Sequence, residues 1–122
     1  MIIPGGSGVE SIRRSSTVKE LLVKAEERNS VIAAICGGPK ALGDVCKNCE
    51  ITCYPPLKDD VEKAVGKDHK LCLDRVHIDN EGKLITSQAP GTAFEFSNAL
   101  IKQLCGEKVA HDTMEKMLVS SV

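Results

Sequence analysis

The chain has 122 residues, which is enough for one domain with a single core and too few for two. Its 16 basic and 17 acidic residues give a formal net charge of −1, so charge offers no basis for binding nucleic acid or an anionic membrane. One tyrosine, two phenylalanines and no tryptophan leave no aromatic platform for stacking bases, and they predict an aliphatic core.

The compartment is predicted from apolar runs and cysteine usage. No apolar run is long enough for a transmembrane helix, and the first residues lack the charged and apolar regions of a signal peptide. Six cysteines without a secretory signal are expected to be reduced thiols rather than a disulfide framework. We therefore expect a cytoplasmic protein with neither a membrane nor a nucleic acid as partner.

The first elements predict a strand, a glycine-rich turn and a helix. Met1–Pro4 is typical of a strand end, and Gly5–Gly8 forms the loop after it. This loop lacks both the lysine of a P-loop and the third glycine of a dinucleotide-binding motif. It is expected either to lend backbone N–H groups to a neighbouring site or to be a plain flexible turn. A capping box of Thr17 and Glu20 then predicts a helix with an apolar face.

The stretch from Val31 to Pro39 dominates the functional prediction. Five apolar residues predict a strand buried on both faces, and they end at Cys36, followed by two glycines and a proline. Pro39 suits the first turn of a helix, predicted over Pro39–Val45. Cys36 is thus expected in a strained elbow at the carboxyl end of a central strand, where α/β sheets bind ligands and amide groups stabilise a thiolate. The alternative is a buried cysteine that merely caps the strand.

The other cysteines give weaker signals. Cys46 and Cys49 form a C-x-x-C pair, but a helix precedes it and the predicted strand Glu50–Tyr54 follows, the reverse of a thioredoxin-like order. A zinc site would draw on Cys46, Cys49, Cys53 and either Cys72 or His69. No second cysteine or histidine pair completes such a site, so we expect incidental thiols and no metal.

A helix and a hairpin follow. Asp59–Val65 is predicted as a short, mostly exposed helix. Strands over Leu71–Asp79 and Leu84–Ser87 flank a turn at residues 80–83, which predicts a β-hairpin. The mixed polarity of its first strand predicts an edge position, with His77 as a solvated strand residue rather than a ligand or base.

The C-terminal part predicts a loop and two helices. Gln88–Gly91 is a second loop at the carboxyl end of a strand. Thr92 and Glu95 form a capping box for a helix over Ala93–Cys105, and a last helix is predicted to begin near Asp112. Strands that alternate with helices predict a parallel sheet covered on both faces.

Three motifs together resemble the ThiJ/PfpI superfamily, and most closely its Parkinson-disease protein deglycase and glyoxalase branch. They are Ile2–Gly6, Ala33–Pro39 and Thr86–Phe96. The likeness runs from Met1 to the final helix. It implies a flavodoxin-like three-layer α/β/α sandwich with a mainly parallel sheet, in which residues 1–122 are one ThiJ/PfpI-type domain. It also implies that this is the C-terminal portion of an N-terminally incomplete family domain.

The resemblance implies a cofactor-free glyoxalase that converts methylglyoxal to lactate, or a protein deglycase, working as a homodimer. Its substrate would be a small aldehyde or a glycated protein. Cys36 would be the nucleophile. The implied pocket consists of the backbone amides of Gly5, Gly6 and Gly37 and, as further possible members, Tyr54, Pro90 and Gly91.

The sequence is also compatible with two other functions. Cys36 oxidation to a sulfinate would serve an oxidative-stress sensor or chaperone-like protein equally well, because both need the same thiolate. A thiazole-phosphate role in thiamine biosynthesis is a weaker alternative, since no phosphate motif is present. The chain also departs from the family pattern. The family's glutamate beside the nucleophile is absent, and Tyr54 stands where a histidine is usual.

Overall fold

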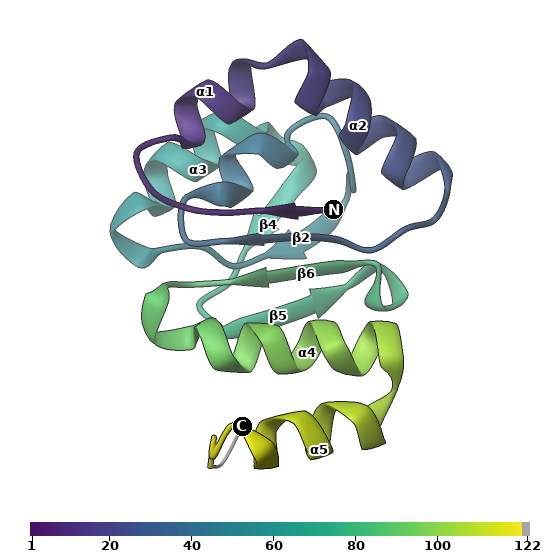
Figure 1. Ribbon diagram of the computed structural model, residues 1–122. Helices are drawn as coiled ribbons and strands as arrows, with labels where there is room; N and C mark the ends of the chain where they lie inside the picture. The colour runs from purple at the N-terminus through teal and green to yellow at the C-terminus, as the bar shows by residue number, and fades with distance from the viewer. Residues whose placement is uncertain (121–122) are drawn as a thin grey trace.

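The computed structural model describes residues 1–120 and has the alternating strands and helices of an α/β sandwich (Figure 1). The helices and strands are β1 (Ile2–Ile3), α1 (Val9–Arg14), α2 (Ser16–Glu27), β2 (Ile32–Ile35), β3 (Cys49–Ile51), α3 (Lys58–Val65), β4 (His69–Leu71), β5 (Val76–Asp79), β6 (Leu84–Ser87), α4 (Ala93–Cys105) and α5 (Glu107–Lys116). Short 3₁₀ helices connect them: η1 (Gly38–Leu42), η2 (Pro55–Leu57), η3 (Gly66–Asp68), η4 (Asn80–Gly82) and η5 (Pro90–Thr92). None of these helices is long and apolar enough to cross a membrane.

The main sheet has four strands in the order β1-β2-β6-β5. β1, β2 and β6 run parallel, and β5 pairs with β6 in the antiparallel sense. A separate parallel pair, β3 and β4, lies next to it. The mainly parallel sheet, the hairpin and the edge position of its first strand are therefore confirmed.

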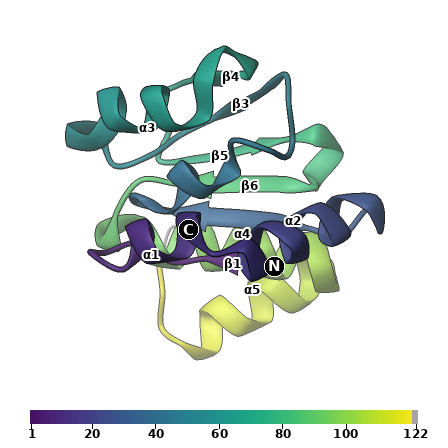
Figure 2. The ribbon, with the colours of Figure 1, turned by 90° about the horizontal axis from the view of Figure 1, so that it is seen from above.

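Two apolar clusters make this a three-layer molecule. Along β2, Ile32 and Ala34 belong to the cluster covered by α2 and α3, while Ala33 belongs to the other with Ile85 of β6 and Phe96 of α4. This division follows from the alternation of side chains along a strand, so a strand buried on both faces must be apolar throughout. Figure 2 shows α3 with the β3–β4 pair on one side of the molecule, away from α1 and α2.

The N-terminal helical region differs from the prediction. The chain forms α1, which was not predicted, and α2 begins at Ser16 rather than after Thr17. Ser15 is extended between the two helices, and its Oγ accepts a hydrogen bond from the Val18 N–H at 3.3 Å. The capping box of Thr17 and Glu20 was therefore wrong, because Ser15 caps the helix two residues earlier.

Two predicted strands are shorter than expected. The strand predicted over Glu50–Tyr54 ends at Ile51, because the Thr52 N–H donates to the side-chain Oγ1 of Thr86 in β6, at 2.9 Å, instead of to a backbone carbonyl. The strand predicted over Leu71–Asp79 is two strands, β4 and β5, separated by residues 72–75. This connection leads from the small sheet to the edge of the main one.

The C-terminal helices confirm one boundary and correct another. Helix α4 spans Ala93–Cys105 as predicted, although Thr92 Oγ1 bonds to the backbone of Ala89 rather than capping the helix. Helix α5 starts five residues before Asp112, directly after Gly106, whose φ of 92° turns the chain. The start predicted near Asp112 was therefore wrong, because Asp112 lies inside this helix, where it pairs with Lys108.

Candidate active site

Cys36 lies at the carboxyl end of β2, as the sequence predicted, and its backbone adopts a left-handed conformation with φ of 64°. Its N–H donates to the Ser87 carbonyl at 3.0 Å, and its carbonyl accepts from the Tyr54 N–H at 3.0 Å. The half-buried cysteine is thus held between the end of β6 and the segment after β3. This is the geometry of a nucleophile elbow, in which the side chain leaves a sharp turn at the end of a strand.

Gly5 brings the first loop against this cysteine. A Cβ on Gly5 would lie 2.6 Å from Cys36 Cβ and 3.2 Å from its Sγ, so only glycine permits this approach. Gly6 has a φ of 93° and open space around it. Within residues 1–120, the N–H groups of Gly5, Gly6 and Gly37 donate no hydrogen bond to the protein. Gly6 is exposed and Gly5 is half-buried, whereas Gly37 is buried.

The turn after Cys36 differs from the prediction in one respect. The α-helix expected over Pro39–Val45 is the 3₁₀ helix η1, Gly38–Leu42. A turn this short carries a much smaller dipole than a full α-helix, so the helix macrodipole contributes less to the site than expected. Thiolate stabilisation must therefore come mainly from individual N–H groups.

The other predicted pocket residues differ in how they are joined to Cys36. Tyr54 is joined to it by the backbone hydrogen bond, and its side chain is 38% exposed. Pro90 and Gly91 are exposed in η5, and the Gly91 carbonyl accepts from Arg75 at 3.1 Å. Ser87 lies three residues before Pro90, and its carbonyl accepts the hydrogen bond from the Cys36 N–H.

Sequence reasoning missed Ser87. Its carbonyl fixes the Cys36 N–H, and its Oγ donates to the Arg75 carbonyl at 2.9 Å and contacts Thr92 Oγ1 at 2.5 Å. Ser87 stands opposite Ile35 in the parallel register of β2 and β6. The role of Ser87 depends on the pairing of the ends of β2 and β6, and a single sequence does not specify that pairing.

The remaining cysteines differ from Cys36 in their surroundings. Burial, and after it the charge of Glu26, raises the pKa of the Cys46 thiol to about 12. Burial also raises the pKa of Cys53 to about 11 and raises those of Cys49 and Cys72. All six cysteines are free, and no group of three possible metal ligands in the described part of the chain includes Cys46, Cys49 or Cys53.

We expect these differences to set the order of alkylation. A thiol with a pKa near 12 has about a thousandfold fewer thiolates at neutral pH than an ordinary cysteine. Iodoacetamide should therefore modify Cys36 and the exposed reference Cys105 well before Cys46 and Cys53. Peptide mass spectrometry over a time course measures the order. Early modification of Cys46 would contradict it and favour a reactive C-x-x-C pair.

Comparison with known proteins identifies the family. The DJ-1/PfpI family model matches residues 1–103, and the chain therefore belongs to the DJ-1/PfpI family. The Parkinson disease protein 7 homolog of Danio rerio is 36% identical over 113 residues, covering 90% of this chain and 58% of that protein. The glutathione-independent glyoxalase DJR-1.2 of Caenorhabditis elegans is 32% identical over 123 residues, covering 98% and 62%.

Solved structures agree with the fold. The crystal structure of Drosophila melanogaster DJ-1beta superposes with a TM-score of 0.87 at 32% identity, covering 98% of this chain and 63% of that chain. Oxidized Toxoplasma gondii DJ-1 gives a TM-score of 0.78 at 26% identity, covering 96% and 62%. The resemblance to the superfamily and its flavodoxin-like fold is thus confirmed. The chain spans about three fifths of the length of the curated relatives named here.

Proposed function

We propose that this chain carries the nucleophile of a glutathione-independent glyoxalase, which converts methylglyoxal to lactate without a cofactor. The observation that carries the proposal is the left-handed, doubly hydrogen-bonded backbone of Cys36 at the end of β2. The Caenorhabditis elegans relative, named as such a glyoxalase, supports the choice of reaction. A protein deglycase would use the same first step on the glycated side chain of another protein.

The chemistry begins with the sulfur. The Cys36 thiolate adds to the aldehyde carbon, forming a C–S bond while the carbonyl π electrons move to oxygen. The free N–H groups of Gly5, Gly6 and Gly37 would stabilise this oxyanion. A general base then moves the proton from the former aldehyde carbon to the adjacent carbon, which gives a thioester. Water displaces the sulfur, so methylglyoxal plus one water yields lactate.

The direct test measures lactate from methylglyoxal in two proteins. One is this chain alone. The other is a fusion behind the residues that precede the matching region in the Caenorhabditis elegans relative, because the chain spans 62% of that protein. We expect the fusion to form lactate without glutathione. A folded fusion that binds methylglyoxal covalently at Cys36 but releases no lactate would contradict the proposal.

Tyr54 is not expected to move the proton. A phenol is a poor general base near neutral pH, and Tyr54 is partly accessible to water. We therefore expect Tyr54→Phe in the fusion to keep most of its activity. Phenylalanine retains the backbone N–H that donates to Cys36, so only the hydroxyl is tested. A loss of about a hundredfold or more in kcat, which is typical of removing a general acid or base, would show that Tyr54 takes part.

A redox sensor is the second candidate, in which peroxide oxidises Cys36 to a sulfinate. The raised pKa of the thiols at Cys46, Cys49, Cys53 and Cys72 favours it, because it leaves oxidation concentrated at Cys36 and Cys105. Mass spectrometry after mild peroxide, together with the lactate assay, separates the two functions. A homodimer in the cytoplasm stays a prediction, and light scattering coupled to gel filtration tests the oligomeric state.

A further inference from the structure

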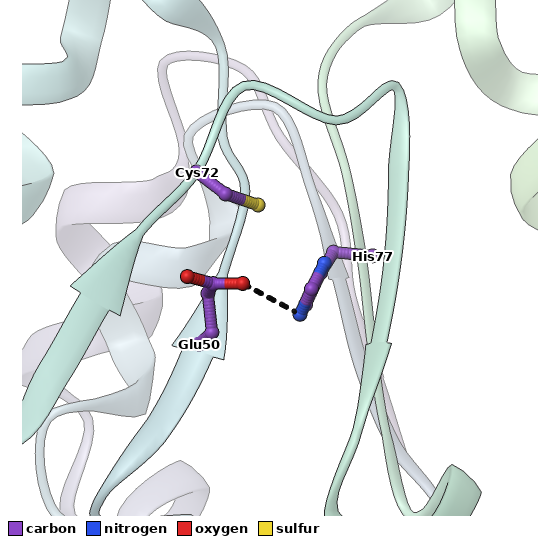
Figure 3. A group of neighbouring side chains, drawn as sticks. All are labelled: Glu50, Cys72 and His77. Carbon is purple, nitrogen blue, oxygen red and sulfur yellow. Dashed lines mark ion pairs between the residues drawn. The ribbon is translucent and has the colours of Figure 1, made fainter.

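Glu50 meets two side chains that follow it by more than 20 residues in the sequence, beside the main sheet. Glu50 lies in β3, Cys72 directly follows β4, and His77 lies in β5. Their ligand atoms all lie within 4.8 Å of one another, and His77 Nε2 is 3.3 Å from Glu50 Oε1. Figure 3 shows the carboxylate, the thiol and the imidazole facing a common space, with the Glu50–His77 ion pair drawn. The expectation that His77 is simply a solvated strand residue was wrong, since its side chain is only 18% exposed.

The backbone around this cluster is fixed. The Glu50 N–H donates to Asp79 Oδ2 at 2.6 Å, and the Cys72 N–H donates to the Ile51 carbonyl at 2.9 Å. Thr52 Oγ1 donates to the Asp74 carbonyl at 2.7 Å, which holds the connection between β4 and β5. The backbone that carries the three side chains is therefore held by strand pairing and by partly buried hydrogen bonds.

Asp74 completes the arrangement. Its Oδ2 lies 2.8 Å from His77 Nδ1, and with an N–H at Nδ1 the other ring nitrogen is left facing Glu50. The Nε2 atom then meets the Glu50 carboxylate either through a proton on the imidazole or through a cation that both groups bind. A carboxylate on the far nitrogen of a histidine is also the usual way in which proteins orient a metal-binding imidazole.

We propose that Glu50, Cys72 and His77 bind a Zn²⁺ ion, with water in the fourth position. A thiolate, an imidazole and a carboxylate are the three ligand types that zinc takes in proteins. In a tetrahedral site with bonds of about 2.0–2.1 Å, two nitrogen or oxygen ligands lie about 3.3 Å apart. The separation of His77 Nε2 and Glu50 Oε1 fits this value without movement. The Cys72 Sγ lies within 4.8 Å of the ligand atoms of both Glu50 and His77, so it is the ligand that moves when the ion binds.

This site is separate from the elbow and from the C-x-x-C pair. The sequence predicted no metal, because no second cysteine or histidine pair completed a site of Cys46, Cys49, Cys53 and either Cys72 or His69. His69 is instead buried, and its Nε2 lies 2.9 Å from the Val45 carbonyl. The proposal does not depend on the glyoxalase chemistry, since none of its ligands is placed in that mechanism.

The experiment measures Zn²⁺ affinity by competition with a chromogenic chelator, and it records the absorption spectrum with Co²⁺ in place of Zn²⁺. We expect one ion per chain and a thiolate-to-cobalt charge-transfer band. Cys72→Ser should abolish the band, and His77→Gln and Glu50→Gln should weaken Zn²⁺ binding at least tenfold. Asp74→Asn, which keeps all three ligands, should weaken it by about 10- to 100-fold.

Three matched variants serve as controls. Cys36→Ser and Cys105→Ser each remove another accessible thiol, and His111→Gln removes the histidine of the exposed group His111, Asp112 and Glu115. All three should keep the cobalt band and the Zn²⁺ affinity of the parent. Circular dichroism checks that each variant folds. No charge-transfer band in the parent, a band that survives Cys72→Ser, or a band lost in folded Cys36→Ser would each overturn the proposal.

Discussion

Replacing Cys36 with serine is expected to lower lactate formation by the fusion protein at least about a thousandfold, to the level of the uncatalysed reaction. Serine keeps a Cβ in the same left-handed backbone and the same hydrogen bonds to Ser87 and Tyr54, so the elbow is preserved. It offers only a hydroxyl, which has almost no ionised form at neutral pH. Initial rates with methylglyoxal measure the change.

Cys105→Ser is the matched control, because it makes the same replacement at the exposed end of α4. It should leave the rate within about twofold of the parent. Retention of more than about a tenth of the activity by Cys36→Ser would show that another group attacks the aldehyde. Urea denaturation of both variants separates a loss of chemistry from a loss of fold.

Gly38→Ala is expected to reduce the free energy of unfolding by about 1–3 kcal/mol, the usual cost of overpacking a closely packed position. A Cβ at Gly38 would lie 2.7 Å from the Ile3 carbonyl oxygen and 3.1 Å from that of Pro4. Both are backbone atoms, so the clash is relieved only when β1 moves and strains its pairing with β2. Urea denaturation of this chain measures the change.

Gly91→Ala is the comparison for this effect. A Cβ there meets no heavy atom within 4 Å, and its carbonyl can still accept from Arg75. We expect a change of less than about 0.5 kcal/mol, or a slight stabilisation, because alanine restricts the unfolded chain. Equal destabilisation by both replacements would mean that the contact between Gly38 and β1 does not limit stability.

The elements with a strong local pattern were predicted from the sequence. The apolar run before Cys36 specified β2 and its elbow, and Ala93–Cys105 has both a periodic apolar face and a closing glycine. Helix α1 has a weak signal, because Val9 is its only buried residue. The start of α5 was missed because Gly106 ends one helix and begins the next, which leaves no separate loop to read.

The parts of the site that depend on the pairing of distant strands could not be predicted from the sequence. Ser87 reaches Cys36 only through the register of β2 and β6. Glu50 lies 22 residues before Cys72 and 27 before His77, and the three come together because β3 pairs with β4 while the chain crosses to β5. Residue type identified each as a possible ligand, but neither periodicity nor spacing joined them into one group.

The left-handed backbone of Cys36 affects which residues suit this position. A residue with a Cβ loses about 1–2 kcal/mol in this conformation relative to glycine, which adopts it freely. A change to glycine would therefore relieve this strain and remove the thiol in the same step. Relief of backbone strain and retention of the sulfur atom therefore require different residues at position 36.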